Sequence, residues 1–194
     1  SLFGHFDAEL KITPVKGKVF DPETEAMRAV EALPMVACYS EVLQDNVLVR
    51  YHDRQGVAVL KGVDASYEQL TQIDSILIDG SFKLADEVVN YANLGIGLAY
   101  ALGINAGFVT PMEIYAPKRA ERVNMANPAS SFQLEYAYIG SVFRTDQQLY
   151  DDSYLIVPLA LARSLFDYEH EVSAIELKLH DSKQVAQAKQ EISR

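Results

Sequence analysis

Residues 91–117, with the sequence YANLGIGLAYALGINAGFVTPMEIYAP, predict a strand, a short helix, a turn and a second strand. The apolar positions of the predicted helix fall at helical spacing: Leu94, Leu98, Ala101 and Leu102. Gly103 follows them, where a helix often ends in the left-handed conformation that glycine adopts without steric cost. In the second strand, apolar residues alternate with polar ones at the period of a half-buried strand, and they are Met112, Ile114 and Ala116.

The sequence on both sides of this stretch alternates predicted strands and helices. Before it we expect a strand at 8–14, a helix capped by Asp21, strands at 35–43, 47–51 and 57–63 with turns at 44–46 and 53–56, and a short helix from Asp64. After it we expect a strand at 133–144, a polar turn region at 145–152, a strand at 154–157, a helix opened by Pro158, a strand at 172–179 and a helix capped by Asp181.

The order of these elements predicts an α+β fold. Strand–helix–strand units occur near both ends of the chain, and two such units around an antiparallel pair form the split, ferredoxin-like arrangement. We therefore expect one α+β subdomain built from residues 1–63 and 153–194. Residues 64–152 would form an inserted, mainly β subdomain.

Composition excludes some functions. The net charge of -10 argues against a nucleic-acid partner, because phosphate binding needs clustered Lys and Arg. The single cysteine, Cys38, lies in an apolar run and is predicted to be a buried small side chain. No apolar run approaches the roughly 18 residues that a membrane-spanning helix needs, and no signal peptide is present. Both ends of the sequence resemble cuts within a longer chain.

Gly95 and Gly97 follow a predicted strand and open a helix, as in a dinucleotide-binding turn. Tyr100 stands where the third glycine of that motif is required, so the match is partial. The simpler interpretation is that these glycines allow the helix and the sheet to pack closely. A phosphate-binding Gly-Lys-Ser/Thr loop is also missing from the sequence.

The sequence also lacks a recognisable catalytic or metal-binding pattern. Its histidines are not spaced as zinc ligands, and His170 lies between two glutamates in what we interpret as a solvated turn. Asp151 and Asp152 lack the spacing of a calcium loop, and we interpret Asp152 as a turn residue. We therefore expect no enzymatic activity, no cofactor and no metal.

Residues 118–131 form a long connection between two predicted strands. Long loops within compact domains often carry function, although a mobile surface connection is an equally simple interpretation. The candidate partner-binding residues are the basic residues of this loop and one of its apolar residues: Lys118, Arg119, Arg122 and Met125.

Several segments, in this order, resemble a family of bacterial membrane proteins. They are residues 3–12, 93–107, 138–143, 150–159 and 172–179. Together they resemble the extracytoplasmic (periplasmic core) domain of ABC-transporter permeases of the lipoprotein-releasing, macrolide-exporter and FtsX-like type.

The resemblance implies a periplasm-facing domain between two membrane helices of a bacterial inner-membrane permease. It implies a porter-type subdomain with an insertion, a cytoplasmic ATPase subunit as partner, a second permease copy, and transmission of ATP-driven motion to an envelope substrate. It also implies that the 118–131 loop contacts a lipoprotein or a periplasmic carrier.

Two other functions stay open at this stage. The tyrosines and the acidic surface also fit a stand-alone extracytoplasmic module that binds carbohydrate or peptide. An enzyme using scattered Asp and Glu would need two buried carboxylates with raised pKa values in one cleft.

Overall fold

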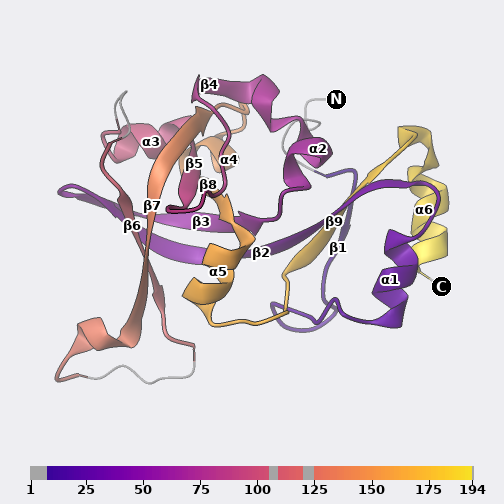
Figure 1. Ribbon diagram of the computed structural model, residues 1–194, viewed down its shortest axis with the longest axis horizontal. Coiled ribbons are helices and arrows are strands. Elements are labelled where there is room, and N and C mark those ends of the chain that lie inside the picture. Colours follow the sequence, from indigo (N-terminus) through magenta and orange to yellow (C-terminus); the bar gives the residue numbers. More distant parts are fainter. Residues whose placement is uncertain (1–7, 105–108, 120–124, 194) are drawn as a thin grey trace.

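The computed structural model describes residues 8–104, 109–119 and 125–193 (Figure 1). Its strands are β1 (Leu10–Ile12), β2 (Val36–Tyr51), β3 (Arg54–Val63), β4 (Leu77–Gly80), β5 (Tyr91–Gly95), β6 (Met112–Pro117), β7 (Phe132–Phe143), β8 (Tyr154–Pro158) and β9 (Ala174–Leu179). Its α-helices are α1 (Glu25–Glu31), α2 (Tyr67–Thr71), α3 (Ile96–Ala101), α4 (Gln148–Ser153), α5 (Leu159–Phe166) and α6 (Val185–Ile192). Short 3₁₀ turns are η1 (Ile73–Ile76), η2 (Pro128–Ser131) and η3 (Ser182–Gln184).

The described strands form one nine-stranded sheet in the order β1-β9-β2-β3-β8-β5-β7-β4. Strand β6 pairs with both β2 and β7, so the path β2-β3-β8-β5-β7-β6 returns to β2 and closes a ring. The β3–β8 and β5–β7 pairs are parallel, and the other pairs are antiparallel.

Strand β2 is the longest element, at 16 residues, and it changes partner along one edge. Its first part pairs with β9 and its last part with β6, while the opposite edge pairs with β3 from Val42 to Tyr51. The turn predicted at residues 44–46 is therefore wrong. These polar residues continue the strand because their backbone pairs with β3, and the amide of Gln44 donates to the Ser173 hydroxyl at 2.8 Å.

Helix α5 fills the ring of strands. Pro158 stands at its N-cap, as predicted, and the helix packs against β2, β3, β6, β7 and β8. Its buried side chains are Leu159, Leu161, Ala162, Leu165 and Phe166. Each large apolar side chain buried in this way contributes about 1.5–3 kcal/mol, so the helix and the ring stabilise each other.

The remaining helices cover other parts of the sheet. A second core cluster lies under α2 and η1, and it includes Cys38, which is buried as predicted. A third cluster joins α1 and α6 to β1 and β9. In Figure 1, β1, α1 and α6 lie at one end of the long axis and β6 and β7 at the other.

Three local predictions need correction. Helix α1 is capped by Thr24, whose hydroxyl accepts from the Met27 amide at 3.2 Å, whereas Asp21 closes a turn before it. Residues 148–153 form α4 rather than a polar turn. Ala101 is exposed on α3, and Ala99 takes its place in the core.

The division into residues 1–63 and 153–194 against 64–152 stays a prediction. Mixed helices and strands agree with the predicted α+β class. The single sheet runs through both predicted parts, since β8 pairs with β3 on one side and with β5 on the other.

Helix α4 explains the two glycines of the 91–117 stretch. A Cβ on Gly95 would collide with the backbone carbonyl oxygen of Asp151 and approach that of Tyr150 to 2.7 Å. A Cβ on Gly97 would collide with the Asp152 carboxylate. The glycines therefore allow the end of β5 and the start of α3 to pack directly on α4. Close packing was predicted, but its partner is helix α4 rather than the sheet.

The contacts that an added Cβ would make predict the order in which three alanine substitutions destabilise the protein. We expect Gly95→Ala to lower the free energy of unfolding by about 2 kcal/mol, because fixed backbone atoms must move. Gly97→Ala should cost less, since the Asp152 side chain can rotate away. Gly56→Ala is the control, because its Cβ would meet nothing within 4 Å. Urea unfolding of the three variants measures the order, and equal effects at all three glycines would contradict it.

A buried ion pair joins two strands across β2. The ammonium of Lys61 on β3 lies 2.7 Å from Oε1 of Glu176 on β9, and both side chains are at most 5% exposed. The ammonium also lies 5.0 Å from the ring centre of Tyr67 on α2. Burial acts to lower the pKa of Lys61, but the Tyr67 oxygen and the Glu176 carboxylate outweigh this effect, so its pKa is raised.

Breaking this pair from one side should be much more costly than replacing both partners. We expect Lys61→Met to destabilise the protein by about 3 kcal/mol, because it leaves the Glu176 carboxylate buried and uncompensated. The double variant Lys61→Met/Glu176→Met should recover most of that loss. The exposed pair Lys18–Asp45 supplies the control, with an expected loss of less than about 1 kcal/mol for Lys18→Met. Chemical denaturation gives the stabilities of the unaltered protein and the three variants. A double variant that is no more stable than Lys61→Met would count against the prediction.

Candidate partner-binding arm

Strands β6 and β7 form a hairpin that we call the arm (residues 112–143). Their cross-strand pairs run from Met112 opposite Ala137 to Pro117 opposite Phe132. The amide of Lys118 then donates to the Ser131 carbonyl at 2.8 Å and extends the pairing. Figure 1 shows the paired ends of β6 and β7 extending away from the rest of the molecule. Lys118 and Ser131, the first and last residues of the predicted loop, therefore lie at the end of a hydrogen-bonded ribbon.

Arg119 joins the segment that follows β6 to the end of α5. Its guanidinium donates to the Asp167 carbonyl at 2.6 Å and lies 4.3 Å from the ring centre of Tyr168. That carbonyl belongs to the residue that ends α5 in the left-handed conformation. The guanidinium of Arg119 is thus used in contacts within the protein. If Arg119 also binds a partner, it must do so while it keeps these contacts.

Of the other three predicted residues, the structure describes Lys118 and Met125. Lys118 is half-buried, and Met125 is 86% exposed. Arg122 lies outside the described residues. Lys118 and Arg119 thus directly follow the end of β6, where Arg119 is held against α5.

A cavity of about 280 Å³ lies beside Arg119. It is bounded by the arm, the end of α5 and the middle of β2, with Lys18, Asp45, Asn46, Pro117, Arg119 and Phe166 among its lining residues. Lys18 and Asp45 form an ion pair at 3.3 Å across it. The cations of this cavity are therefore already engaged by groups of the protein itself.

The outer face of the ring carries an apolar row that the sequence analysis did not identify. Pairing places one residue from each of four strands side by side: Val57, Leu48, Tyr115 and Leu134. Val57 is 74% exposed, and Leu48 and Leu134 are also exposed. Successive residues of β7 point to opposite faces of the strand, but the sequence does not show which face is buried. In the structure, small Ala137 faces the core, and larger Leu134 and Tyr136 face outward.

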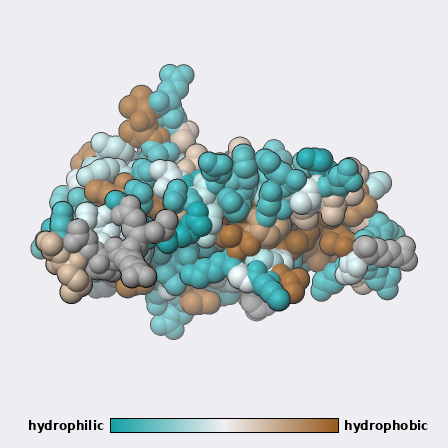
Figure 2. All heavy atoms as spheres, turned by 90° about the horizontal axis from the view of Figure 1, so that it is seen from below, coloured by the Kyte–Doolittle hydropathy of each residue, from teal (hydrophilic) through white to brown (hydrophobic). Residues whose placement is uncertain are grey.

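Figure 2 shows the molecule from the side on which the arm projects. The surface is mainly hydrophilic, in keeping with the net charge of -10, and hydrophobic residues gather in a band across the middle. Apolar residues on this side are therefore grouped, as expected where a surface contacts other molecules.

The described residues contain no group of three or more His, Cys, Asp or Glu that could hold a metal ion. His170 lies 3.3 Å from Glu23 on an exposed surface. The thiol of Cys38 donates to the Ser66 carbonyl at 3.3 Å, and burial raises its pKa, which disfavours the reactive thiolate.

The buried carboxylates serve the fold. Asp151 accepts hydrogen bonds from the amide and hydroxyl of Thr145 and from the amide of Asp146, so it ties the end of β7 to α4. Glu176 pairs with Lys61 in the sheet. They thus have separate structural partners in different parts of the fold.

The fold is that of domains that bacterial transporters place outside the cytoplasm. The extracellular domain of the noncanonic ABC-type transporter YknZ from Gram-positive bacteria is similar, with a TM-score of 0.61 and 13% sequence identity over 89% of this chain and 80% of that chain. The periplasmic region of MacB from Actinobacillus actinomycetemcomitans is also similar, with a TM-score of 0.58 and 9% identity over 90% of this chain and 78% of that chain.

These likenesses confirm, at the level of the fold, the resemblance found in the sequence. They also confirm the α+β class. No family model and no curated protein sequence matches the chain. Among the described helices, none is both long and apolar enough to cross a bilayer.

The Arg119 contact can be tested directly. We expect Arg119→Ala to loosen the contact between the end of β6 and α5, so that hydrogen exchange accelerates at the amides of Lys118 and Tyr168. The free energy of unfolding should fall by about 0.5–1 kcal/mol, the value of an exposed cation–π contact. Arg119→Lys should be intermediate, because lysine keeps the charge but lacks the planar group. Exchange measured by NMR checks this, and Arg28→Ala on α1 is the control. Unchanged exchange at both amides in Arg119→Ala would contradict the anchoring role.

Proposed function

We propose that this chain is the extracytoplasmic domain of an ABC-transporter permease of the lipoprotein-releasing or efflux type. It would transmit ATP-driven movement of membrane helices to an envelope substrate or a partner protein. The observation that carries the proposal is the likeness of fold to the YknZ and MacB domains over about nine-tenths of the chain.

The arrangement of the elements supports a mechanical role. The first and last elements, β1 and α6, lie at the opposite end of the long axis from the arm (Figure 1). Between them, β2 runs from its pairing with β9 into the ring that α5 fills. A displacement applied near β1 and α6 would therefore move the arm through a continuous ladder of hydrogen bonds.

The proposal names partners as well as a role. A cytoplasmic ATPase subunit and a second permease copy would complete the transporter, and a lipoprotein or periplasmic carrier would meet the arm. Exposed Met125 would make the outermost contact, while Lys118, Arg119 and Arg122 would set the charge of the loop. No cofactor, metal or nucleic acid takes part.

A stand-alone carbohydrate- or peptide-binding module is the second candidate. One observation favours it, an open groove with tyrosine walls that is described below. The likeness of fold favours the permease domain, because it extends over most of the chain rather than over one groove.

The proposal is tested on the full natural gene product in its own cell. We expect it to fractionate with the inner membrane, to expose this domain to protease only after the outer barrier is opened, and to co-purify with an ATPase. A full-length product that stays in the soluble fraction would overturn the permease assignment.

The role of the arm needs a separate variant. In the full-length protein, Met125→Asp should complement the deletion strain severalfold less well than the unaltered protein does, because it places a charge at the exposed end of the arm. Val15→Asp is the matched control, since Val15 is fully exposed elsewhere. Equal complementation by both variants at equal protein levels would remove the arm from the proposal and leave the permease assignment standing.

A further inference from the structure

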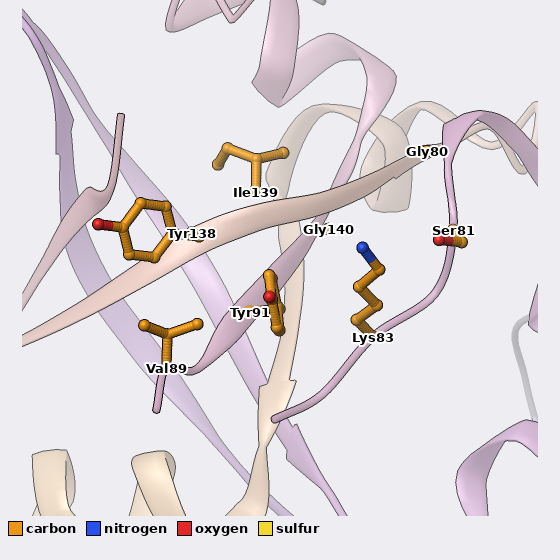
Figure 3. Close-up of a pocket in the computed structure, with 8 residues that line it drawn as sticks. All are labelled: Gly80, Ser81, Lys83, Val89, Tyr91, Tyr138, Ile139 and Gly140. Atoms are coloured by element: carbon orange, nitrogen blue, oxygen red, sulfur yellow. The ribbon is translucent and has the colours of Figure 1, made fainter. Parts of the chain in front are cut away.

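A groove of about 390 Å³ opens beside the second half of β7 (Figure 3). It lies between β4, the start of β5 and the segment that joins them. Its lining residues are Gly80, Ser81, Lys83, Val89, Tyr91, Tyr138, Ile139 and Gly140. This volume lies within the range of small-molecule sites in proteins.

The floor of the groove is bare backbone, and two glycines keep it so. Gly80 has a φ of 70° and lies directly against the Gly140 carbonyl, which accepts a hydrogen bond from the Ser81 amide at 3.2 Å. A Cβ on Gly140 would lie 3.4 Å from the Cβ atoms of Lys83 and Tyr91. Larger residues here would therefore occupy the groove or displace its walls.

The walls are aromatic and are fixed by hydrogen bonds. The hydroxyl of Tyr91 donates to Oδ2 of Asp86 at 2.9 Å. The amide of Tyr138 donates to the Asn90 carbonyl at 2.9 Å, which holds β7 against the segment before β5. Figure 3 shows the rings of Tyr91 and Tyr138 and the side chain of Val89 around the same opening. Such surfaces suit the apolar face of a ligand.

Lys83 brings a positive charge to this opening. Its ammonium lies 5.3 Å from the ring centre of Tyr91, which helps to orient it over the groove. Among the described residues, the ammonium has no carboxylate within ion-pair distance. In a chain of net charge -10, a cation without a direct carboxylate partner in a lined groove is a feature that needs an explanation.

The acidic residues beside the groove accept hydrogen bonds from other groups of the protein. Oδ1 of Asp86 accepts from the amides of Val88 and Val89, both at 2.8 Å, and Oδ2 accepts from Tyr91. These hydrogen bonds lower the pKa of Asp86 and hold its carboxylate in the turn. Asp79 accepts from the Gly80 amide at 2.9 Å. Lys83 is therefore left available for an anion from outside the protein.

We propose that this groove binds a small ligand that carries a carboxylate next to an apolar face. The carboxylate would pair with the ammonium of Lys83 beside the Ser81 hydroxyl, and the apolar face would pack on Tyr91 and Tyr138. A sugar acid and the C-terminal end of a peptide both have this chemistry. The inference does not depend on the permease assignment, because it uses only the groove.

The test uses the whole chain and two pairs of probes, followed by NMR of backbone amides. Glucuronate is compared with glucose, and N-acetyl-Ala-Ala with its C-terminal amide. We expect saturable shifts at the groove amides with at least one carboxylate probe. The affinity of its neutral analogue should be about tenfold lower, because removal of one charge-assisted hydrogen bond of about 1.4 kcal/mol gives that loss. A response to only one carboxylate probe identifies the source of the ligand.

Two variants locate the binding. Lys83→Met should lower the affinity about tenfold, as loss of the carboxylate does. The control Lys11→Met removes an exposed lysine on β1 and should change nothing. Ser81→Trp keeps the positive charge of Lys83 but fills the groove, so it should abolish the shifts. The proposal is overturned by absence of saturable shifts with both carboxylate probes, by equal binding of the neutral analogues, or by unchanged affinity in a folded Lys83→Met variant.

Discussion

The structure depends on the length of one strand, β2. Sixteen residues at about 3.3 Å each reach across roughly 50 Å, which is enough for two different neighbours along one edge. Strand β9 takes the first part of that edge and β6 the last, while β3 holds the opposite edge from Val42 onward. The part of the sheet that carries β1, α1 and α6 is thereby continuous with the ring that carries the arm. A break in β2 would leave two separate sheets.

Local patterns in the sequence predicted most of the elements, because alternation and capping act over a few residues. Residues 91–117 gave a strand, a helix and a strand in the right places, and Gly103 ends the turn after α3 with a φ of 67°. The errors arise where distant pairing overrides local preference. Gln44, Asp45 and Asn46 are turn formers by composition, but β3 satisfies their backbone. Asp151 forms part of a helix because Thr145 and Asp146 donate to it.

Even less of the candidate site than of the fold could be predicted from local sequence patterns. Lys118 and Arg119 could be recognised as basic residues in a long loop, but their partners could not. Arg119 is held by a carbonyl and a ring 48 and 49 positions away, which become available only because α5 ends at Asp167. The apolar row on the outer face exists only through the register of four strands. The Lys83 groove likewise depends on Gly80 and Gly140 meeting across β4 and β7.

The anchoring of the arm bears on how the domain would work. A hairpin joined only through a flexible loop would absorb a displacement at its base by bending. Here β6 pairs with β2 on one edge and with β7 on the other, and Arg119 adds a contact to the helix that fills the ring. Bending at the base would break ladder hydrogen bonds and expose buried Met112 and Ile114, at a cost of several kcal/mol. The paired strands of the arm are therefore expected to move with the ring as one body.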